Sequence, residues 1–266
     1  MDDTNQQVAA DDARLGRRVL TEPSPWPTEN LCLEGSYITL TGLLETDMLS
    51  LWRNLDFAKN PSLLDFIAMQ PPQTVQELWQ AFEYYRRDRG MWVYAIKCTS
   101  DPADLNRPNS DVSRRTKTLG TLAYLDVQPD HRALEVGAVL FSPALQRTPA
   151  ATEANYLLLK NALGLLSPAY RRVVWKCNAL NGASCRAAER LGFVYEGTFR
   201  NHMVAKGRSR DSAWFSILDE EWPLVRKALE EWLSPSNFVG EGKQIRRLED
   251  VRKDVQARKA GPVFVM

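Results

Sequence analysis

Two segments near the middle of the chain each place the start of a predicted helix directly after a predicted β-strand. The first has a strand over residues 134–141, a loop over 142–151 and a helix over 152–160. The second has a strand over residues 172–177 and then a shorter helix. Backbone N–H groups at a helix N-terminus have no partner within the helix and attract anions. This order therefore predicts a binding site for an anionic group.

Three side chains near these segments could transfer protons. Glu135 lies on the first strand, Ser184 lies at the start of the second helix, and His202 lies on a later strand. A carboxylate or an imidazole can take a proton from an amine, and a hydroxyl can give one to a departing group. Each also has an ordinary structural explanation, as an ion-pair partner, a helix-start residue or a polar hairpin residue. The identity of the base stays open, and transfer without a protein base is a further alternative.

The loop before the first helix has features of a phosphate-binding loop. It runs from Gln146 to Ala151 and leads into the sequence Thr-Glu-Ala at 152–154. Pro149 in its centre lacks an N–H donor, but proline is well suited to the first turn of a helix. The loop resembles the phosphate loop of the GNAT N-acetyltransferases, with Gln146 and Ala151 matching and Pro149 replacing a glycine.

The second helix start strengthens this resemblance. Asn181 and Ser184 come before the run Ala-Glu-Arg-Leu-Gly-Phe at 188–193, and a basic turn follows at 207–211. The order and spacing of these motifs are similar to those in one branch of the family, the ribosomal-protein N-terminal acetyltransferases. Residues 175–177 and the run 200–211 are also similar to those of acetyltransferases that inactivate microcin C. The resemblance covers residues 34–222.

The resemblance implies an α/β GNAT fold, with a central mixed, mostly antiparallel sheet splayed between two parallel strands and flanked by helices. Acetyl-coenzyme A would lie in the splay as the acetyl donor. Ser184 would protonate the departing thiolate, and Asn181 would contact the cofactor or simply cap its helix. The implied cofactor contacts are Val139, Leu140, Gln146, Arg147, Thr148, Ala150, Ala151, Thr152, Asn181 and Ser184.

The acceptor amine stays open at this point. An aminoacyl nucleotide, a protein N-terminus and a small amine are the alternatives, each attacking directly without an acetyl-enzyme. Met203 stands where part of the branch has a carboxylate. Together with Pro149, this leaves a non-catalytic acyl-coenzyme A binding module as the alternative function. Candidate acceptor contacts, which could equally be core residues, are Trp92, Tyr124, Trp175, Arg200 and Trp214.

Composition sets further limits on the function. The chain has 266 residues, with 34 basic and 33 acidic side chains and a net charge of +1. We therefore expect no bulk attraction to nucleic acid or to an anionic membrane. The four cysteines show no metal-type pairing, which predicts reduced thiols and no metal site. A polar N-terminus without a targeting pattern indicates the cytoplasm. The protein could be a monomer or a homodimer.

We expect three regions along the chain. Residues 1–30 should be disordered or loosely packed, residues 31–233 should form the acetyltransferase domain, and residues 234–266 should form a basic helical tail. The tail helix either folds back on the domain or stays exposed to contact a partner. Further strands are expected at 37–42, 91–97 and 118–127, helices at 46–55, 74–89 and 219–233, and a hairpin of strands 199–206 and 211–218.

Overall fold

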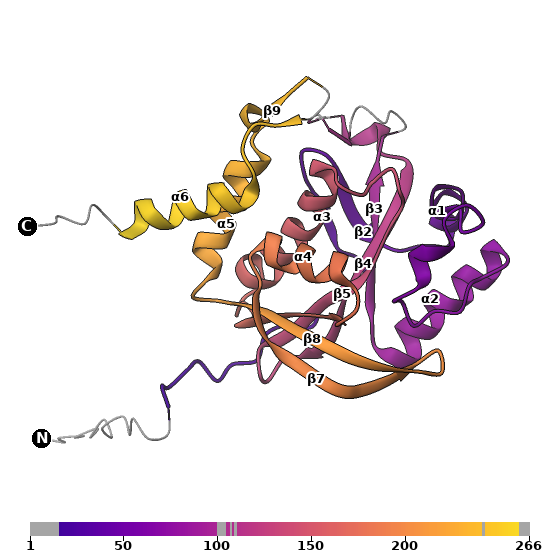
Figure 1. Ribbon diagram of the computed structural model, residues 1–266, viewed down its shortest axis with the longest axis horizontal. Coiled ribbons are helices and arrows are strands. Elements are labelled where there is room, and N and C mark those ends of the chain that lie inside the picture. Colours follow the sequence, from indigo (N-terminus) through magenta and orange to yellow (C-terminus); the bar gives the residue numbers. More distant parts are fainter. Residues whose placement is uncertain (1–15, 100–104, 107, 109–110, 241–242, 261–266) are drawn as a thin grey trace, which may run out of the picture.

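The alternating apolar residues of the chain become the strands of one mixed sheet (Figure 1). The computed structural model describes residues 16–99, 105–106, 108, 111–240 and 243–260. Within these residues, eight strands form a sheet in the order β1-β2-β3-β4-β5-β6-β8-β7. The strands are β1 (Cys32–Glu34), β2 (Thr39–Gly42), β3 (Trp92–Cys98), β4 (Lys117–Gln128), β5 (Ala133–Phe141), β6 (Arg172–Asn178), β7 (Val194–Ala205) and β8 (Arg208–Leu218).

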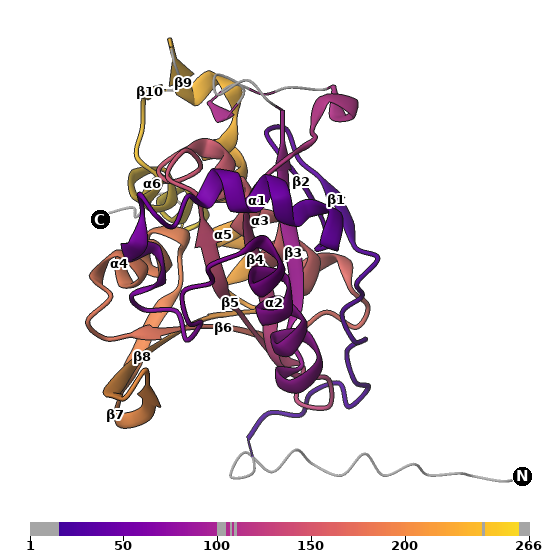
Figure 2. The same cartoon turned by 90° about the vertical axis from the view of Figure 1, so that its right-hand side faces the viewer.

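Helices cover both faces of this sheet. In Figure 1, α1 and α2 lie to its right and α3, α4 and α5 to its left, whereas Figure 2 looks onto the side of α1 and α2. The predicted helices near 46–55, 74–89 and 219–233 are confirmed, and α3 begins three residues earlier than predicted. The helices are α1 (Met48–Leu55), α2 (Val75–Arg89), α3 (Pro149–Lys160), α4 (Gly182–Leu191), α5 (Trp222–Leu233) and α6 (Leu248–Ala260).

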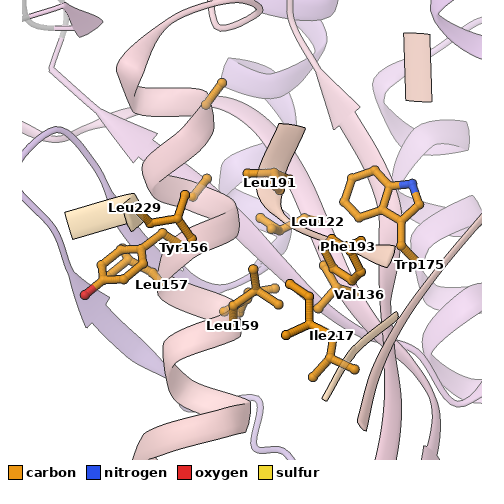
Figure 3. Packing of buried hydrophobic residues seen from close by; sticks show 14 of the residues in the cluster. Leu122, Val136, Tyr156, Leu157, Leu159, Trp175, Leu191, Phe193, Ile217 and Leu229 are labelled. Carbon is orange, nitrogen blue, oxygen red and sulfur yellow. The ribbon is translucent and has the colours of Figure 1, made fainter. Parts of the chain in front are cut away.

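Each face of the sheet has its own hydrophobic core. Leu122 and Tyr124 of β4 belong to the core under α3 and α5, whereas Ala123 between them belongs to the core under α1 and α2. This alternation follows from the period of two along a strand. Figure 3 shows the first core, where Trp175 of β6 lies against Phe193 with ring centroids 5.6 Å apart.

Strands β5 and β6 form the parallel pair and then separate. Their pairing covers Ala133↔Arg172, Leu134↔Val173 and Glu135↔Val174, and no further pairs follow. Beyond this point β5 is bulged against β4, and Ala138 in the bulge has a left-handed φ of 49°. A bulge bends its strand and re-aims the neighbouring groups. The two strands therefore open a wedge in the middle of the sheet.

Helix α3 is locked to the start of the domain by a buried carboxylate. Glu153, which is 4% exposed, accepts the backbone N–H groups of Ser36, Tyr37 and Ile38 at 2.6, 2.7 and 3.0 Å. Arg115 donates to the backbone oxygens of Gly35 and Ser36 in the same turn. Charge-assisted bonds of this kind fix a helix more firmly than neutral ones. They set the position of the α3 N-terminus beside the wedge.

The predicted hairpin is confirmed as β7 and β8, and it forms one end of the sheet. The register shifts between Tyr195 and Gly197 and again between Phe199 and Met203. Asn201 within the second irregularity has a left-handed φ of 50°. At the tip, Lys206 Nζ donates to the carbonyl of Leu64 at 2.7 Å, which joins the hairpin to the loop between α1 and α2.

The C-terminal helix α6 folds back on the domain. Leu248, Val251 and Val255 are buried there, whereas Ile245, expected on the same apolar stripe, is exposed. Short strands β9 (Phe238–Val239) and β10 (Lys243–Gln244) join α5 to α6. At the other end, the carbonyls of Pro25 and Thr28 accept the hydroxyls of Tyr170 and Tyr94. The division of the chain at residues 31 and 233 stays a prediction, and residues 1–15 lie outside the described residues.

Candidate active site

A cavity of about 1040 Å³ fills the wedge between β5 and β6. Val139 and Leu140 line it from β5, and Asn181 and Ser184 line it at the start of α4. The loop before α3 and its first turn contribute Gln146, Arg147, Thr148, Ala151 and Thr152. The structure thus brings together all the predicted cofactor contacts except Ala150, which is fully buried and does not line the cavity.

The N-terminus of α3 faces this cavity. Thr148 is its N-cap, and its Oγ1 accepts the N–H of Ala151 at 3.1 Å. Pro149 occupies the first helical position, where a backbone N–H would have no partner within the helix. Gln146 Nε2 donates to the carbonyl of Phe141, so this side chain braces the loop. The loop therefore presents a helix N-terminus that can bind an anion, and Pro149 is compatible with this arrangement.

The start of α4 presents a hydroxyl to the same cavity. Asn181 caps the helix, because its Oδ1 accepts the N–H of Ser184 at 3.1 Å. Ser184 Oγ accepts the indole N–H of Trp175 at 3.0 Å. Since the oxygen accepts this bond, the hydroxyl proton of Ser184 can be donated to a second partner, and the Cys177 thiol is one such neighbour. Trp175, expected among the acceptor contacts, lines the same cavity as Ser184.

A second cavity, of about 480 Å³, lies against the sheet and is lined by Glu135, Lys176 and Trp214. Trp175 and Lys176 are consecutive residues of β6, so their side chains point to opposite faces of the sheet. Glu135 and Ser184 line different cavities.

Glu135 is a buried carboxylate with an unusual pKa. It is 6% exposed, and burial raises its pKa from the ordinary value of 4.5 to about 7. Lys176 Nζ lies 2.7 Å from Glu135 Oε2 and opposes this rise, whereas nearby Asp126 adds to it. A carboxylate with a pKa near neutrality can both take and release a proton at physiological pH. Glu135 therefore has the chemistry of a general base.

Lys176 forms ion pairs with two carboxylates beside the smaller cavity. It contacts Asp126 as well as Glu135, and its Nζ lies 4.8 Å from the centre of the Trp214 ring. Burial lowers the pKa of Lys176, but the two carboxylates outweigh it and raise the pKa. Asp126 reaches this position from a bulge in β4, where its φ is 44°. The cluster is thus a charged group with one cation and two carboxylates.

The chain is similar to known proteins both in sequence and in structure. Residues 38–194 match the family model of the acetyltransferase (GNAT) domain. A GCN5-related N-acetyltransferase from Brucella melitensis is 34% identical, with 87% of this chain and 98% of that chain covered and a TM-score of 0.76. The chain belongs to the GNAT family. Since the matches are acetyltransferases, it is an acetyl-coenzyme A-dependent N-acetyltransferase, which disfavours the non-catalytic binding module.

Two further solved structures of acetyltransferases are similar to this chain. A probable acetyltransferase of the GNAT family from Chromobacterium violaceum ATCC 12472 is 33% identical, covering 78% of this chain and 96% of that chain, with a TM-score of 0.64. An acetyltransferase from Salmonella typhimurium that modifies the N-terminal serine of ribosomal protein L7/L12 is 18% identical, covering 69% and 96%, with a TM-score of 0.53. At that identity the likeness shows the fold alone. A search of curated proteins found no match.

The GNAT hairpin carries three aromatic rings on the side of the smaller cavity. Phe199 and Trp214 lie with ring centroids 4.7 Å apart, and the His202 ring lies 5.9 Å from Trp214. His202 Nδ1 lies 2.9 Å from Ser212 Oγ. His202 lines neither cavity, and Arg200 is exposed nearby. The irregular register between Phe199 and Met203 explains why both Phe199 and His202 reach Trp214.

Tyr124 is a correction to the expected acceptor site of this GNAT enzyme. The side chain is fully buried, and its hydroxyl donates to the carbonyl of Leu158 at 2.6 Å and lies 3.2 Å from Asn161 Nδ2. It is a core residue because it faces α3. Trp92, its cross-strand neighbour, packs against the same core.

Cys177 is poorly suited to act as a nucleophile. Cys177 Sγ and Cys185 Sγ lie 3.5 Å apart, and burial raises the pKa of Cys177 to about 12. A thiol with so high a pKa is a poor nucleophile at neutral pH. In the part of the chain that the structure describes, no three side chains form a metal-binding group. No helix in the described ranges is both long and apolar enough to cross a membrane.

Sequence reasoning missed several charged residues of the site. Lys176 and Asp126 complete the cluster around Glu135, and their contact depends on the bulge in β4. Arg186, Arg190 and Lys243 also line the larger cavity. The i, i+4 spacing of Arg186 and Arg190 on a helix could have placed them on one face. No sequence signal connects Lys243 with them.

Proposed function

We propose that this GNAT enzyme transfers the acetyl group of acetyl-coenzyme A to a primary amine by direct attack, with Glu135 as the general base. The observation that carries this proposal is the position of Glu135. It lies in the last paired position before β5 and β6 separate, and burial brings its pKa to about 7. A base with this pKa is matched to an amine that must lose a proton near neutral pH.

The larger cavity supports the donor side of the proposal. Its size, the helix N-terminus at Thr148 and the nearby Arg147 suit an extended ligand with a pyrophosphate. Acetyl-coenzyme A bound there would supply a thioester-activated acetyl group. The backbone at Val139 and Leu140, just after the bulge, would donate hydrogen bonds to the carbonyl oxygen as negative charge develops on it.

Ser184 supports the second proton transfer. Its oxygen accepts the Trp175 indole N–H at 3.0 Å, which leaves its own proton to be donated into the cavity. We assign it the protonation of the departing thiolate. Glu135 and Ser184 then act on opposite sides of the wedge, one on the amine and the other on the thiol. No covalent acetyl-enzyme is needed in this scheme, which agrees with the high pKa of Cys177.

Among the acceptor classes, an aminoacyl nucleotide has the most specific structural support. The exposed ring of Phe199, the half-buried Trp214 and the ring of His202 offer surfaces for a planar base. Arg200 and Arg208 of the same hairpin are exposed cations. A protein N-terminus and a small polyamine stay as alternatives. The known action of the Salmonella relative on a ribosomal protein makes a short peptide a necessary comparison.

The test is release of coenzyme A from acetyl-coenzyme A in the presence of different amines, followed with a thiol reagent against a blank for the protein cysteines. The panel contains an aminoacyl-sulfamoyl adenosine, short peptides with free N-termini, polyamines and amino acids. We expect turnover with the aminoacyl adenosine to exceed the others. Faster turnover with a peptide or a polyamine would show that the acceptor belongs to that class and not to the aminoacyl nucleotides. Binding of acetyl-coenzyme A without any turnover above hydrolysis would argue against the proposed reaction.

A further inference from the structure

The larger cavity continues beyond the part of the chain that matches the family model. Residues 38–194 match that model, but Trp232, Phe238, Lys243 and Gln244 also line the cavity. We infer that the C-terminal segment completes a subsite for the 3′-phosphoadenosine end of coenzyme A, in which Lys243, Arg186 and Arg190 hold the 3′-phosphate. The inference rests on the proposed function, because it assigns the far end of the same donor site.

The C-terminal segment is held firmly enough to form such a site. The buried Asn237 donates through Nδ2 to the carbonyls of Trp232 and Arg246 and accepts the N–H of Arg246 through Oδ1. Strands β9 and β10 pair as Val239↔Lys243 and Phe238↔Gln244. The indole of Trp232 donates to Gln244 Oε1 at 3.1 Å. These contacts position Lys243 and Gln244 on a small hairpin beside the cavity.

Arg190 lies between the α3 N-terminus and Trp232 of α5, the residue that contacts Gln244 of the hairpin. Its Nη1 donates to Thr152 Oγ1 at 3.0 Å, and its guanidinium lies 4.6 Å from the centre of the Trp232 ring. Burial lowers the pKa of Arg190, the nearby Arg252 and Arg247 lower it further, and Glu249 opposes this shift. Among the described residues, no carboxylate lies within ion-pair distance of it. A bound phosphate would therefore add a direct ion-pair partner for this guanidinium.

The charges that line the cavity are strongly unequal. Arg147, Arg186, Arg190 and Lys243 are cations, and within the described residues Asp65 is the only carboxylate that lines it. The cations belong to two groups. Arg147 lies on the loop before α3, where the helix N-terminus suits the pyrophosphate. Arg186 and Lys243 lie on α4 and β10, and Arg190 of α4 also reaches Thr152 in the first turn of α3. Coenzyme A carries a pyrophosphate and a separate ribose 3′-phosphate, so two groups of cations match its two anionic parts.

An apolar surface accompanies the second group of cations. Phe238 is half-buried, and its ring meets Trp232 edge-on with centroids 5.1 Å apart. A purine can pack against such a ring at little entropic cost. The subsite therefore combines an aromatic side chain with three cations. This combination suits a phosphorylated nucleoside and distinguishes it from pantetheine alone.

The test compares the binding of coenzyme A with that of 3′-dephospho-coenzyme A by titration calorimetry of the full-length protein at one fixed salt concentration. We expect the native protein to bind coenzyme A at least about tenfold more tightly, as charge-assisted contacts to one phosphate should provide. Lys243→Ala should reduce this ratio about threefold or more, with the affinity for dephospho-coenzyme A unchanged. Arg186→Ala should act in the same direction.

Lys253→Ala is the matched control. Lys253 is exposed on α6 and does not line the cavity, so its removal changes the net charge equally and should preserve the ratio. Equal binding of both ligands by the native protein would overturn the inference, and so would an equal loss for both ligands in Lys243→Ala. Either result would leave the proposed function intact. Failure of the native protein to bind any coenzyme A would overturn both.

Discussion

Lys176 Nζ lies 2.7 Å from Glu135 Oε2, so a strand on one side of the wedge supplies the counter-ion for a carboxylate on the other. The contact bridges β5 and β6 close to the point where their pairing ends at Glu135↔Val174. Through this contact, the charge of Lys176 affects the pKa of Glu135, the proposed base.

Glu135→Gln should lower kcat/KM by about 100-fold, the lower range for loss of general base catalysis. Because the pKa of Glu135 is raised to about 7, its ionised form increases as pH rises through 7. The native profile should therefore rise with pH around 7, and the variant should lack this limb. Initial rates between pH 5.5 and 9 provide the measurement. Glu34→Gln, at an exposed position on β1, is the control. A variant that keeps the limb near pH 7 would exclude Glu135 as the base.

Lys176→Met should move the pH–rate limb to higher pH. The cation favours the ionised form of Glu135, so its loss raises the pKa of that carboxyl further, and the neighbouring Asp126 adds to the effect. Lys176→Arg keeps the charge and should leave the limb closer to its native position. A simple structural role for Lys176 would lower the rate at every pH without moving the limb.

Glu153→Gln should lower the free energy of unfolding by about 3 kcal/mol, since three buried N–H groups lose a charged acceptor. The new amide also places a donor where only acceptors fit. Urea unfolding at pH 7 measures the change. Glu189→Gln, exposed on α4, should change stability by less than about 0.5 kcal/mol. Similar values for both variants would mean that the contact of α3 with residues 36–38 contributes little.

Val251→Ala should cost about 2 kcal/mol of stability, because Val251 is 1% exposed between α6 and the domain. Gln256→Ala, on the exposed side of the same helix, should have almost no effect. Thermal and urea unfolding should agree on this difference. If both substitutions were neutral, α6 would not be part of the cooperative fold, and its alternative role as a partner-binding segment would regain support.

Most strands and helices could be predicted because their patterns are local. The short apolar run of β3, the mostly apolar run of β4 and the Thr74 cap of α2 depend only on neighbouring residues. Pro149 at the start of α3 likewise follows from the fixed φ of proline. The strand β1 was not predicted, since three residues provide too short a pattern to distinguish from a loop.

The site was harder to predict because it depends on register between distant strands. Tyr124 and Trp214 are both aromatic residues on predicted strands, but Tyr124 faces the core under α3 and Trp214 faces the smaller cavity. The bulges at Asp126 and Ala138 decide which side chains meet, and no local pattern marks them. The cofactor contacts came from the family resemblance, whereas the contact of Lys176 with Glu135 required the folded sheet.

The two register shifts in β7 also bear on how the protein behaves in concentrated solution. β7 is the edge of the sheet and exposes Val194, Tyr195, Phe199, Met203 and Val204. A straight edge with such side chains would invite another copy to add a strand and start an aggregate. Bulges interrupt the row of backbone groups that such an addition requires. The irregular edge can thus display apolar side chains toward an acceptor while offering no continuous template for self-association.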